Sequence, residues 1–350
     1  MRQRISYYDL ARGLAILLVI FYHVPLYIRI CHPCAAELLT PHINAGTYIL
    51  PFFMPVFFII SGCFTNTDKN YGQFLWSDVK HLLLAGLLLS FVNVAIQSVG
   101  LRDIGAVQWF VKTLFSIHFM DLILANWFIS AIFFSRQIFY AVDHVSRTIS
   151  KERKGLYWSL LFGMLACFAI IGILVEPYAP HNNQWFYCQG LVFAVFIAFG
   201  RLMKEYPLNK WWLSGIGIGY VLLMLVARRA GISTLEYGMV NTSFTLAHWP
   251  FYMLLALTGS ALLIALAQII NRFAPLEFIG RHSLIFYIPQ GGVLLVTATL
   301  LGRWFLPNKN MHVWLYILIL WLSALLVLSV LSFLRDIIHS AYTRISSKNL

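Results

Sequence analysis

The sequence predicts an all-α, polytopic integral membrane protein with about ten transmembrane helices. Hydrophobic residues make up 60% of the 350 residues and charged residues only 11%, whereas soluble domains have roughly 45–50% and about 25%. The apolar residues gather in helix-length runs of about twenty, not in the roughly ten-residue alternating segments of a membrane barrel. No polar linker interrupts them, so residues 1–350 are expected to form a single transmembrane domain. A soluble globular protein is excluded.

Ten apolar runs are long enough to count as membrane spans. Their approximate limits are 10–30, 47–65, 82–101, 123–142, 157–175, 185–202, 211–228, 249–270, 282–301 and 313–334. The first run has a charged start like that of a secretory signal, but no small-residue cleavage site follows it, so it is kept as a span. An even number of spans places both termini on one side of the membrane.

The distribution of Lys and Arg predicts which side that is. With the N-terminus inside, seventeen of these residues fall in inner connections and tails and seven in outer ones. The positive-inside rule therefore predicts that both termini are cytoplasmic. The basic residues are spread over short connections instead of forming one patch, so the formal net charge of +12 indicates a membrane surface and not nucleic acid as the partner.

The first run contains ionisable residues, which are costly inside a membrane and are therefore functional candidates. These are Arg12 and His23, with Asp9 directly before the run, and His23 lies deep in an unbroken apolar stretch. Eleven residues separate Arg12 from His23, which puts both on one helix face within about 20° and about 16 Å apart along the axis. Asp9 precedes Arg12 by three positions and is expected to pair with its guanidinium.

Two interpretations of this helix remain open. In the functional one, Pro25 bends the helix just past His23 and opens space for a substrate. In the structural one, Arg12 is an interfacial anchor, His23 hydrogen-bonds a neighbouring helix and Pro25 is an ordinary kink.

Two small residues, Ser61 and Gly62, lie near the end of the second run, at the expected cytoplasmic level of Arg12. Small residues at that position would admit either the backbone of another helix or a narrow ligand.

Four motifs occur in order along the chain. They are Arg12-x10-His23, then Pro55-Val-Phe-Phe-Ile-Ile-Ser61-Gly62, then Asn126-Trp127-Phe128, and then Phe278-Ile-Gly280-Arg-His-Ser283-Leu-Ile-Phe-Tyr287. In this order they resemble the acyltransferase-3 family of membrane O-acyltransferases, whose core has ten helices. No hydrolase-like domain follows the last run, so the resemblance is to the stand-alone members that acetylate sugars of envelope polysaccharides or glycolipids.

The resemblance implies roles for individual residues. His23 would be the catalytic histidine, with Arg12, oriented by Asp9, as its partner at the donor side. Ser61, Gly62 and Lys80 would bind the donor, although family members often carry a basic pair where this chain has Lys80 and His81. Trp127 and Gln290 would meet the acceptor, although Gln290 stands where family members often have histidine, and tryptophan is ordinarily enriched at such a depth.

The resemblance also implies the substrates and the location. Acyl-CoA, most simply acetyl-CoA, would be a cosubstrate and no bound cofactor would be needed. A sugar or lipid-linked glycan would be the acceptor, membrane lipid would surround the protein, and the membrane would be the bacterial inner (plasma) membrane. No metal-ligand cluster is present in the sequence.

The chemistry allows two routes through His23. A histidine can take the proton of a hydroxyl as it attacks a thioester, and burial in the apolar run favours the neutral, basic imidazole. Alternatively, His23 first accepts the acyl group itself.

Two other classes of function stay open. A secondary transporter of a small polar solute would also have buried ionisable groups, but no repeat relates residues 1–175 to 176–350. A redox role would rest on Cys31 and Cys34, for which a local disulfide or no role at all is the expected alternative.

Overall fold

The computed structural model describes residues 6–32, 50–114, 127–151, 153–179, 185–229, 249–305 and 313–346. These residues form helices and no strand, which confirms the predicted all-α class. The helices are α1 (Ser6–Cys31), α3 (Leu50–Phe53), α4 (Pro55–Phe64), α5 (Tyr71–Asp78), the π-helix η2 (Val79–Leu84), α6 (Ala85–Leu101), α7 (Gly105–Leu114), α9 (Trp127–Ser150), α10 (Lys154–Val175), the 3₁₀ turn η3 (Glu176–Tyr178), α12 (Tyr187–Glu205), α13 (Lys210–Arg229), α14 (Trp249–Ile270), α15 (Ala274–Arg281), α16 (Ser283–Tyr287), α17 (Gln290–Phe305) and α18 (Val313–Ser346).

Seven helices in the described ranges are long and apolar enough to cross a membrane. They are Ser6–Cys31, Tyr71–Leu101, Lys154–Tyr178, Tyr187–Glu205, Lys210–Ala227, Trp249–Ile270 and Val313–Ala341. Each matches one of the ten predicted runs, and several leave large apolar side chains on the outer surface, such as Leu222 on α13 and Leu326 on α18. Such surfaces are stable only in lipid, so the chain is an integral membrane protein. The count of ten spans and the cytoplasmic termini stay predictions.

The remaining three runs form shorter or more polar helices. Run 47–65 is divided at Met54 into α3 and α4, where Pro55 has no backbone N–H to continue the ladder. Run 282–301 is divided before α17, again next to a proline, Pro289. Run 123–142 lies partly outside the described residues, and its helix α9 continues to Ser150 with a polar face.

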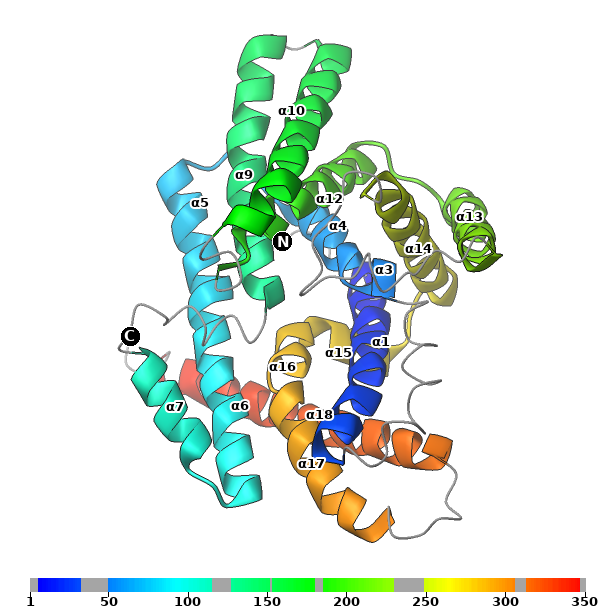
Figure 1. Ribbon diagram of the computed structural model, residues 1–350. Coiled ribbons are helices and arrows are strands. Elements are labelled where there is room, and N and C mark those ends of the chain that lie inside the picture. The colour runs from blue at the N-terminus through cyan, green and yellow to red at the C-terminus, as the bar shows by residue number, and fades with distance from the viewer. Residues whose placement is uncertain are drawn as a thin grey trace.

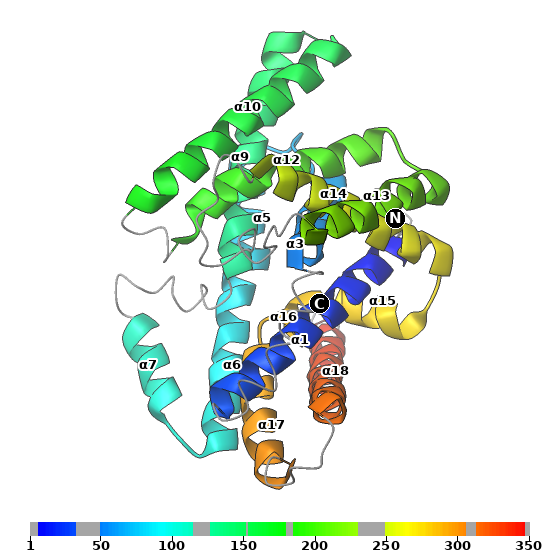
Figure 2. The same ribbon diagram turned by 45° about the vertical axis from the view of Figure 1, so that its right-hand side comes forward.

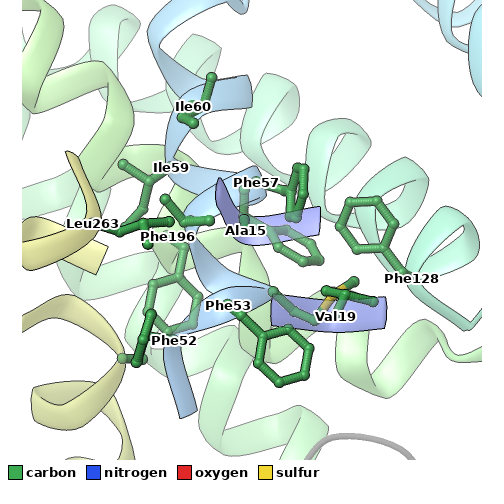
Figure 3. Close-up of a cluster of buried hydrophobic side chains, with 14 of the residues drawn as sticks. Ala15, Val19, Phe52, Phe53, Phe57, Ile59, Ile60, Phe128, Phe196 and Leu263 are labelled. Carbon is green, nitrogen blue, oxygen red and sulfur yellow. The ribbon is translucent and has the colours of Figure 1, made fainter. Parts of the chain in front are cut away.

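Helix α1 lies at the centre of the bundle and contacts α3, α4 and all of α14 to α18 (Figures 1 and 2). The core is formed by α1, these neighbours and α12, which packs on α4. There the side chains of α1, α3, α4, α9, α12 and α14 interdigitate (Figure 3), as shown by Val19, Phe53, Phe128, Phe196 and Leu263. This packing holds α1 on several sides, so the polar groups that it carries have fixed positions.

Helices α4 and α12 cross with their backbones in contact because both have glycine at the crossing. A Cβ atom on Gly62 would lie 2.0 Å from the carbonyl oxygen of Ile197, and one on Gly200 would lie 1.8 Å from that of Ile59. The structure therefore shows the helix-packing alternative for Gly62. A donor contact at Gly62 stays a prediction.

A buried carboxylate connects the α9–α10 hairpin to the connection before α5. Asp143 is fully buried on α9 and accepts hydrogen bonds from Thr67 Oγ1, at 2.6 Å, and from the hydroxyl of Tyr157 on α10. Arg147 Nη2 lies 3.0 Å from the same carboxylate. The charge is thus paired and hydrogen-bonded, as burial requires.

Candidate active site

Asp9, Arg12 and His23 all lie on α1, as the sequence predicts. The helix runs without interruption from Ser6 to Cys31 and includes Pro25. An unbroken α-helix places Arg12 and His23 about 16 Å apart along the axis. The two groups therefore occupy different depths of the same helix.

The predicted pair between Asp9 and Arg12 is confirmed. Arg12 Nη1 donates to Asp9 Oδ1 at 3.4 Å, and the side chains are 27% and 7% exposed respectively. The guanidinium carbon also lies 5.5 Å from the ring centroid of Phe64, at the end of α4, in a cation–π contact. Arg12 is thus oriented from two sides while part of it stays accessible.

The Gly280 motif places α15 against this part of α1. A Cβ atom on Gly280 would lie 1.7 Å from the carbonyl oxygen of Asp9, and one on Gly13 would lie 2.2 Å from that of Leu276. Only glycine allows the two backbones to approach so closely. The motif glycine therefore supports the segment that carries Asp9 and Arg12.

His23 presents one ring nitrogen for chemistry. Its Nδ1 lies 2.7 Å from the carbonyl oxygen of Val19, and because a carbonyl only accepts, Nδ1 carries the proton. Nε2 is then the lone-pair nitrogen, and no described residue hydrogen-bonds to it. The side chain is half-buried, and a lone-pair nitrogen is what a base or nucleophile needs.

Polar groups from α6 and α17 gather one turn beyond His23. Tyr27 follows His23 by four residues on the same helix face, and its hydroxyl lies against α17, where a Cβ atom on Gly291 would be 2.7 Å away. The amide of Gly292 donates to Asn93 Oδ1 at 2.6 Å. Sequence reasoning did not identify Tyr27 or Asn93.

Gln290, a predicted acceptor residue, begins α17 beside these groups. Its side chain is only 6% exposed, and its Oε1 receives no hydrogen bond from the described part of the chain. A buried acceptor without a donor is costly, so it needs an explanation. A hydroxyl of a bound sugar would supply the missing donor.

Trp127, the other predicted acceptor residue, is buried at the start of α9. It is 7% exposed, and its ring centroid lies 5.8 Å from that of Phe193. In this arrangement Trp127 forms part of the core, as a structural tryptophan would. Stacking of Trp127 on a sugar stays a prediction.

Arg136 forms a polar cluster at the end of α4 that sequence reasoning did not identify. Its Nη1 donates to Ser61 Oγ at 2.9 Å and to Thr65 Oγ1 at 2.8 Å, and its Nε donates to Asp78 Oδ2 at 2.9 Å. Asp78 also accepts from Gln137 Nε2 at 2.9 Å. Within the described ranges nothing accepts from Nη2 of Arg136, and the side chain is 17% exposed, so one edge of the guanidinium can meet an anion.

Lys80 lies in η2, two residues after Asp78, and its side chain is exposed. A π-helical turn is uncommon and frequently occurs at functional sites. Arg12 and Arg136 both contact the last two turns of α4, and Lys80 follows the carboxylate that orients Arg136. The structure therefore brings Arg12, Ser61 and the new residue Arg136 together around the end of α4. Lys80 is not a member of this cluster.

The cysteine motif is only partly described. Cys31 Sγ lies 3.7 Å from the carbonyl oxygen of Leu295 and accepts from Thr299 Oγ1 at 3.4 Å, both on α17. Cys34 lies outside the described residues, so the pairing of the two cysteines stays untested. In the residues that the structure describes, no group of three His, Cys, Asp or Glu side chains could hold a metal ion.

Comparison with known families matches residues 5–333 to the family described as an acyltransferase domain. Comparisons with curated proteins and with solved structures found no match. The family match covers nearly the whole chain, including all four motifs, and agrees with the helical membrane architecture. The chain therefore belongs to the acyltransferase-3 family and is a membrane acyltransferase.

Proposed function

We propose that this protein is an O-acyltransferase that moves an acetyl group from cytoplasmic acetyl-CoA to a sugar hydroxyl of a cell-envelope polysaccharide or glycolipid. The observation that carries the proposal is the state of His23. Its Nδ1 is bound to Val19 of its own helix, which leaves Nε2 as a base inside the bundle, on the helix that also carries Arg12. Family membership favours this function over the secondary transporter.

The general-base route balances with His23 alone. Nε2 takes the proton of the sugar hydroxyl while the hydroxyl oxygen forms a bond to the carbonyl carbon of the thioester. The carbon–sulfur bond then breaks, and the imidazolium returns the proton to the departing CoA sulfur. In the acyl-carrier route, Nε2 itself attacks the thioester carbonyl, the carbon–sulfur bond breaks and CoA leaves as the thiolate. In a second step the sugar hydroxyl attacks the acyl carbon, the carbon–Nε2 bond breaks, and the hydroxyl proton passes through Nε2 to the CoA thiolate.

The donor would lie between the cations at the end of α4 and His23. CoA is a multiply charged molecule whose nucleotide end is too costly to place in hydrocarbon. Arg12 and Arg136 are each held by a carboxylate and retain exposed surface, and with Lys80 they provide the charges that phosphates require. The slender pantetheine arm is comparable in length with the axial separation of about 16 Å between Arg12 and His23.

The acceptor would approach from the opposite end of α1. Gln290 offers a buried oxygen without a donor, and Tyr27 and Asn93 lie against the same first turn of α17. Amide and phenol groups are the usual partners of sugar hydroxyls because they both donate and accept. The site therefore suits a polyhydroxylated acceptor better than an apolar one.

The test is transfer of label. Membranes that contain the protein are incubated with [¹⁴C]acetyl-CoA and a total lipid-linked glycan extract, beside membranes without the protein. We expect a glycan that is labelled only in the presence of the protein and that loses the label under mild alkali, as an O-ester does. If acetyl-CoA is consumed but no glycan is labelled, a glycan is not the acceptor. If acetyl-CoA is not consumed at all, it is not the donor.

A further inference from the structure

An apolar crevice with a volume of about 430 Å³ lies between α4, α12, α13 and α14. Helix α12 and Tyr206, which directly follows it, contribute one stripe of side chains along 199–206, and α14 contributes another along 257–264. Each stripe extends over eight residues, or about 10 Å of helix. Leu213 and Ile216 of α13 and Ile59 of α4 also line the crevice.

The crevice is unsuited to water. Of the side chains that line it, Tyr206 alone carries a polar atom. A buried water needs two to four polar partners, and an apolar cavity without them stays dry or takes an apolar ligand. Because the protein is embedded in a membrane, the apolar molecules around it are lipid chains.

The mouth of the crevice has the features of a membrane interface. Tyr206 is 48% exposed and belongs to the short connection between α12 and α13. After this connection, α13 begins with Lys210, Trp211 and Trp212. Lys210 Nζ lies 5.3 Å from the ring centroid of Trp211, and both indoles are largely exposed. Tryptophan and lysine at the end of a span mark the level of the lipid headgroups.

The crevice is separate from the candidate active site. Ile59 faces it from α4, whereas Ser61, two residues later, binds Arg136. Two residues correspond to about 200° around an α-helix, so α4 stands between the crevice and the Arg136 cluster. A ligand of the crevice therefore lies on the other side of α4 from the Arg136 cluster.

We propose that the crevice binds one acyl chain of an anionic glycerophospholipid, with the phosphate beside Lys210. The apolar wall suits an acyl chain. The mouth lies at the level of the lipid headgroups, and Lys210 supplies a positive charge for an anionic phosphate. The site does not depend on the acyltransfer reaction.

The test uses phosphatidylglycerol and phosphatidylcholine that carry the same photoactivatable diazirine fatty chain. The full protein is placed in lipid nanodiscs with either probe, irradiated, and digested to map labelled residues. We expect phosphatidylglycerol to label 199–216 and 257–264 more strongly than the exposed face of α18 at Leu322 and Leu326, and phosphatidylcholine to label all three faces alike. Crevice labelling no stronger than that of α18, or equal for the two lipids, would overturn the proposal.

Variants separate the two parts of the site. Lys210→Gln should lower crevice labelling by phosphatidylglycerol about fivefold, the effect of one lysine near an anionic headgroup, and leave labelling of α18 unchanged. Leu257→Phe, which fills the crevice, should abolish its labelling, while Leu254→Phe on the exposed face of the same helix should not. Ala261→Leu serves the same purpose if Leu257→Phe fails to fold. Undiminished crevice labelling in both Lys210→Gln and a folded filling variant would contradict the assignment.

Discussion

His23 is the residue on which the proposed chemistry depends. Replacement by alanine removes Nε2 and the hydrogen bond to Val19, but it leaves the surrounding apolar packing of α1 in place. We expect acetyl transfer to fall by about 10²–10⁴-fold, as for loss of a general base, with unchanged expression and thermal unfolding. His339→Ala, at an exposed position of α18, is the matched control. Near-normal turnover of His23→Ala would exclude His23 from the reaction.

Arg12 tests the donor end of the site. Arg12→Lys keeps the charge but loses the planar guanidinium that bridges Asp9 and the face of Phe64. The KM for acetyl-CoA should rise by roughly 10–100-fold, the value of a hydrogen bond to a charged group, with a smaller change in kcat. Arg29→Lys, exposed in the last turn of the same helix, should behave as wild type. An unchanged KM in Arg12→Lys would make Arg12 an anchor only.

The arrangement of site residues was predictable from the sequence where the residues lie on the same helix. The Asp9–Arg12 pair follows from a spacing of three, and the common face of Arg12 and His23 follows from a spacing of eleven. The partner of Arg136 lies 58 residues away on another helix, and no periodicity relates them. For the same reason, sequence reasoning missed Asn93, which becomes relevant only when α6 packs against α17.

At the level of helices, the crossing of α1 and α15 depends on glycine. Gly280→Ala would place a methyl group 1.7 Å from the carbonyl oxygen of Asp9, so the helices must separate. We expect a loss of about 1–3 kcal/mol in the free energy of unfolding, as for an overpacked core, together with a raised KM for acetyl-CoA because Asp9 moves. Thermal and denaturant unfolding in detergent and steady-state kinetics measure both effects.

Gly163→Ala is the control for this substitution. Gly163 lies within α10 and has open space where the Cβ atom would be. Alanine is the better helix former there, so the protein should be equally or slightly more stable. Equal behaviour of the two alanine variants would show that the close contact at Gly280 does not matter.

The α9–α10 hairpin provides a second stability prediction. Asp143→Ala leaves Arg147 without its buried partner and should cost about 3–5 kcal/mol, as does removal of one member of a buried pair. Asp68→Ala removes the other carboxylate bound to Arg147, at 2.7 Å, but Asp68 is 70% exposed, so its loss should cost about 0–1 kcal/mol. Denaturant unfolding of the two variants compares them directly, and equal losses would contradict the assigned roles.

The same exposed pair has a defined pH dependence. The hydrogen bond from Arg147 lowers the pKa of Asp68 below its ordinary value. A carboxylate with a lowered pKa stabilises the folded state at neutral pH, and this contribution is lost as the pH falls through that pKa. The small difference in stability between wild type and Asp68→Ala should therefore vanish in acid.

The helical elements were predictable where composition decides them. Long apolar runs gave α1, α10, α12, α13, α14 and α18, because lipid accepts any sufficiently apolar helix. The divisions at Met54 and before α17 each lie next to a proline, a signal that the run lengths concealed. The sequence did not predict that the polar face of α9 is buried. Asp143 on that face is bound by Thr67 and Tyr157, which come from two other segments.

Across the whole molecule, cationic groups and uncharged polar groups lie near opposite ends of α1. Oriented cations lie around one end of α4, near the start of α1, whereas Tyr27, Asn93 and Gln290 gather near its other end. His23 lies between them. We therefore expect this order along one helix to serve the proposed transfer between substrates on opposite sides of the membrane.

Sealed inside-out vesicles keep the two faces of the membrane apart, so they test whether the acetyl group crosses it. Glycan acceptor is trapped in the lumen, and [¹⁴C]acetyl-CoA, which does not cross the bilayer, is added to the exposed cytoplasmic face. We expect luminal glycan to become labelled with wild-type protein and His339→Ala and to stay unlabelled with His23→Ala. Label only on glycan added outside, or luminal label that survives His23→Ala, would rule out transfer across the membrane through His23.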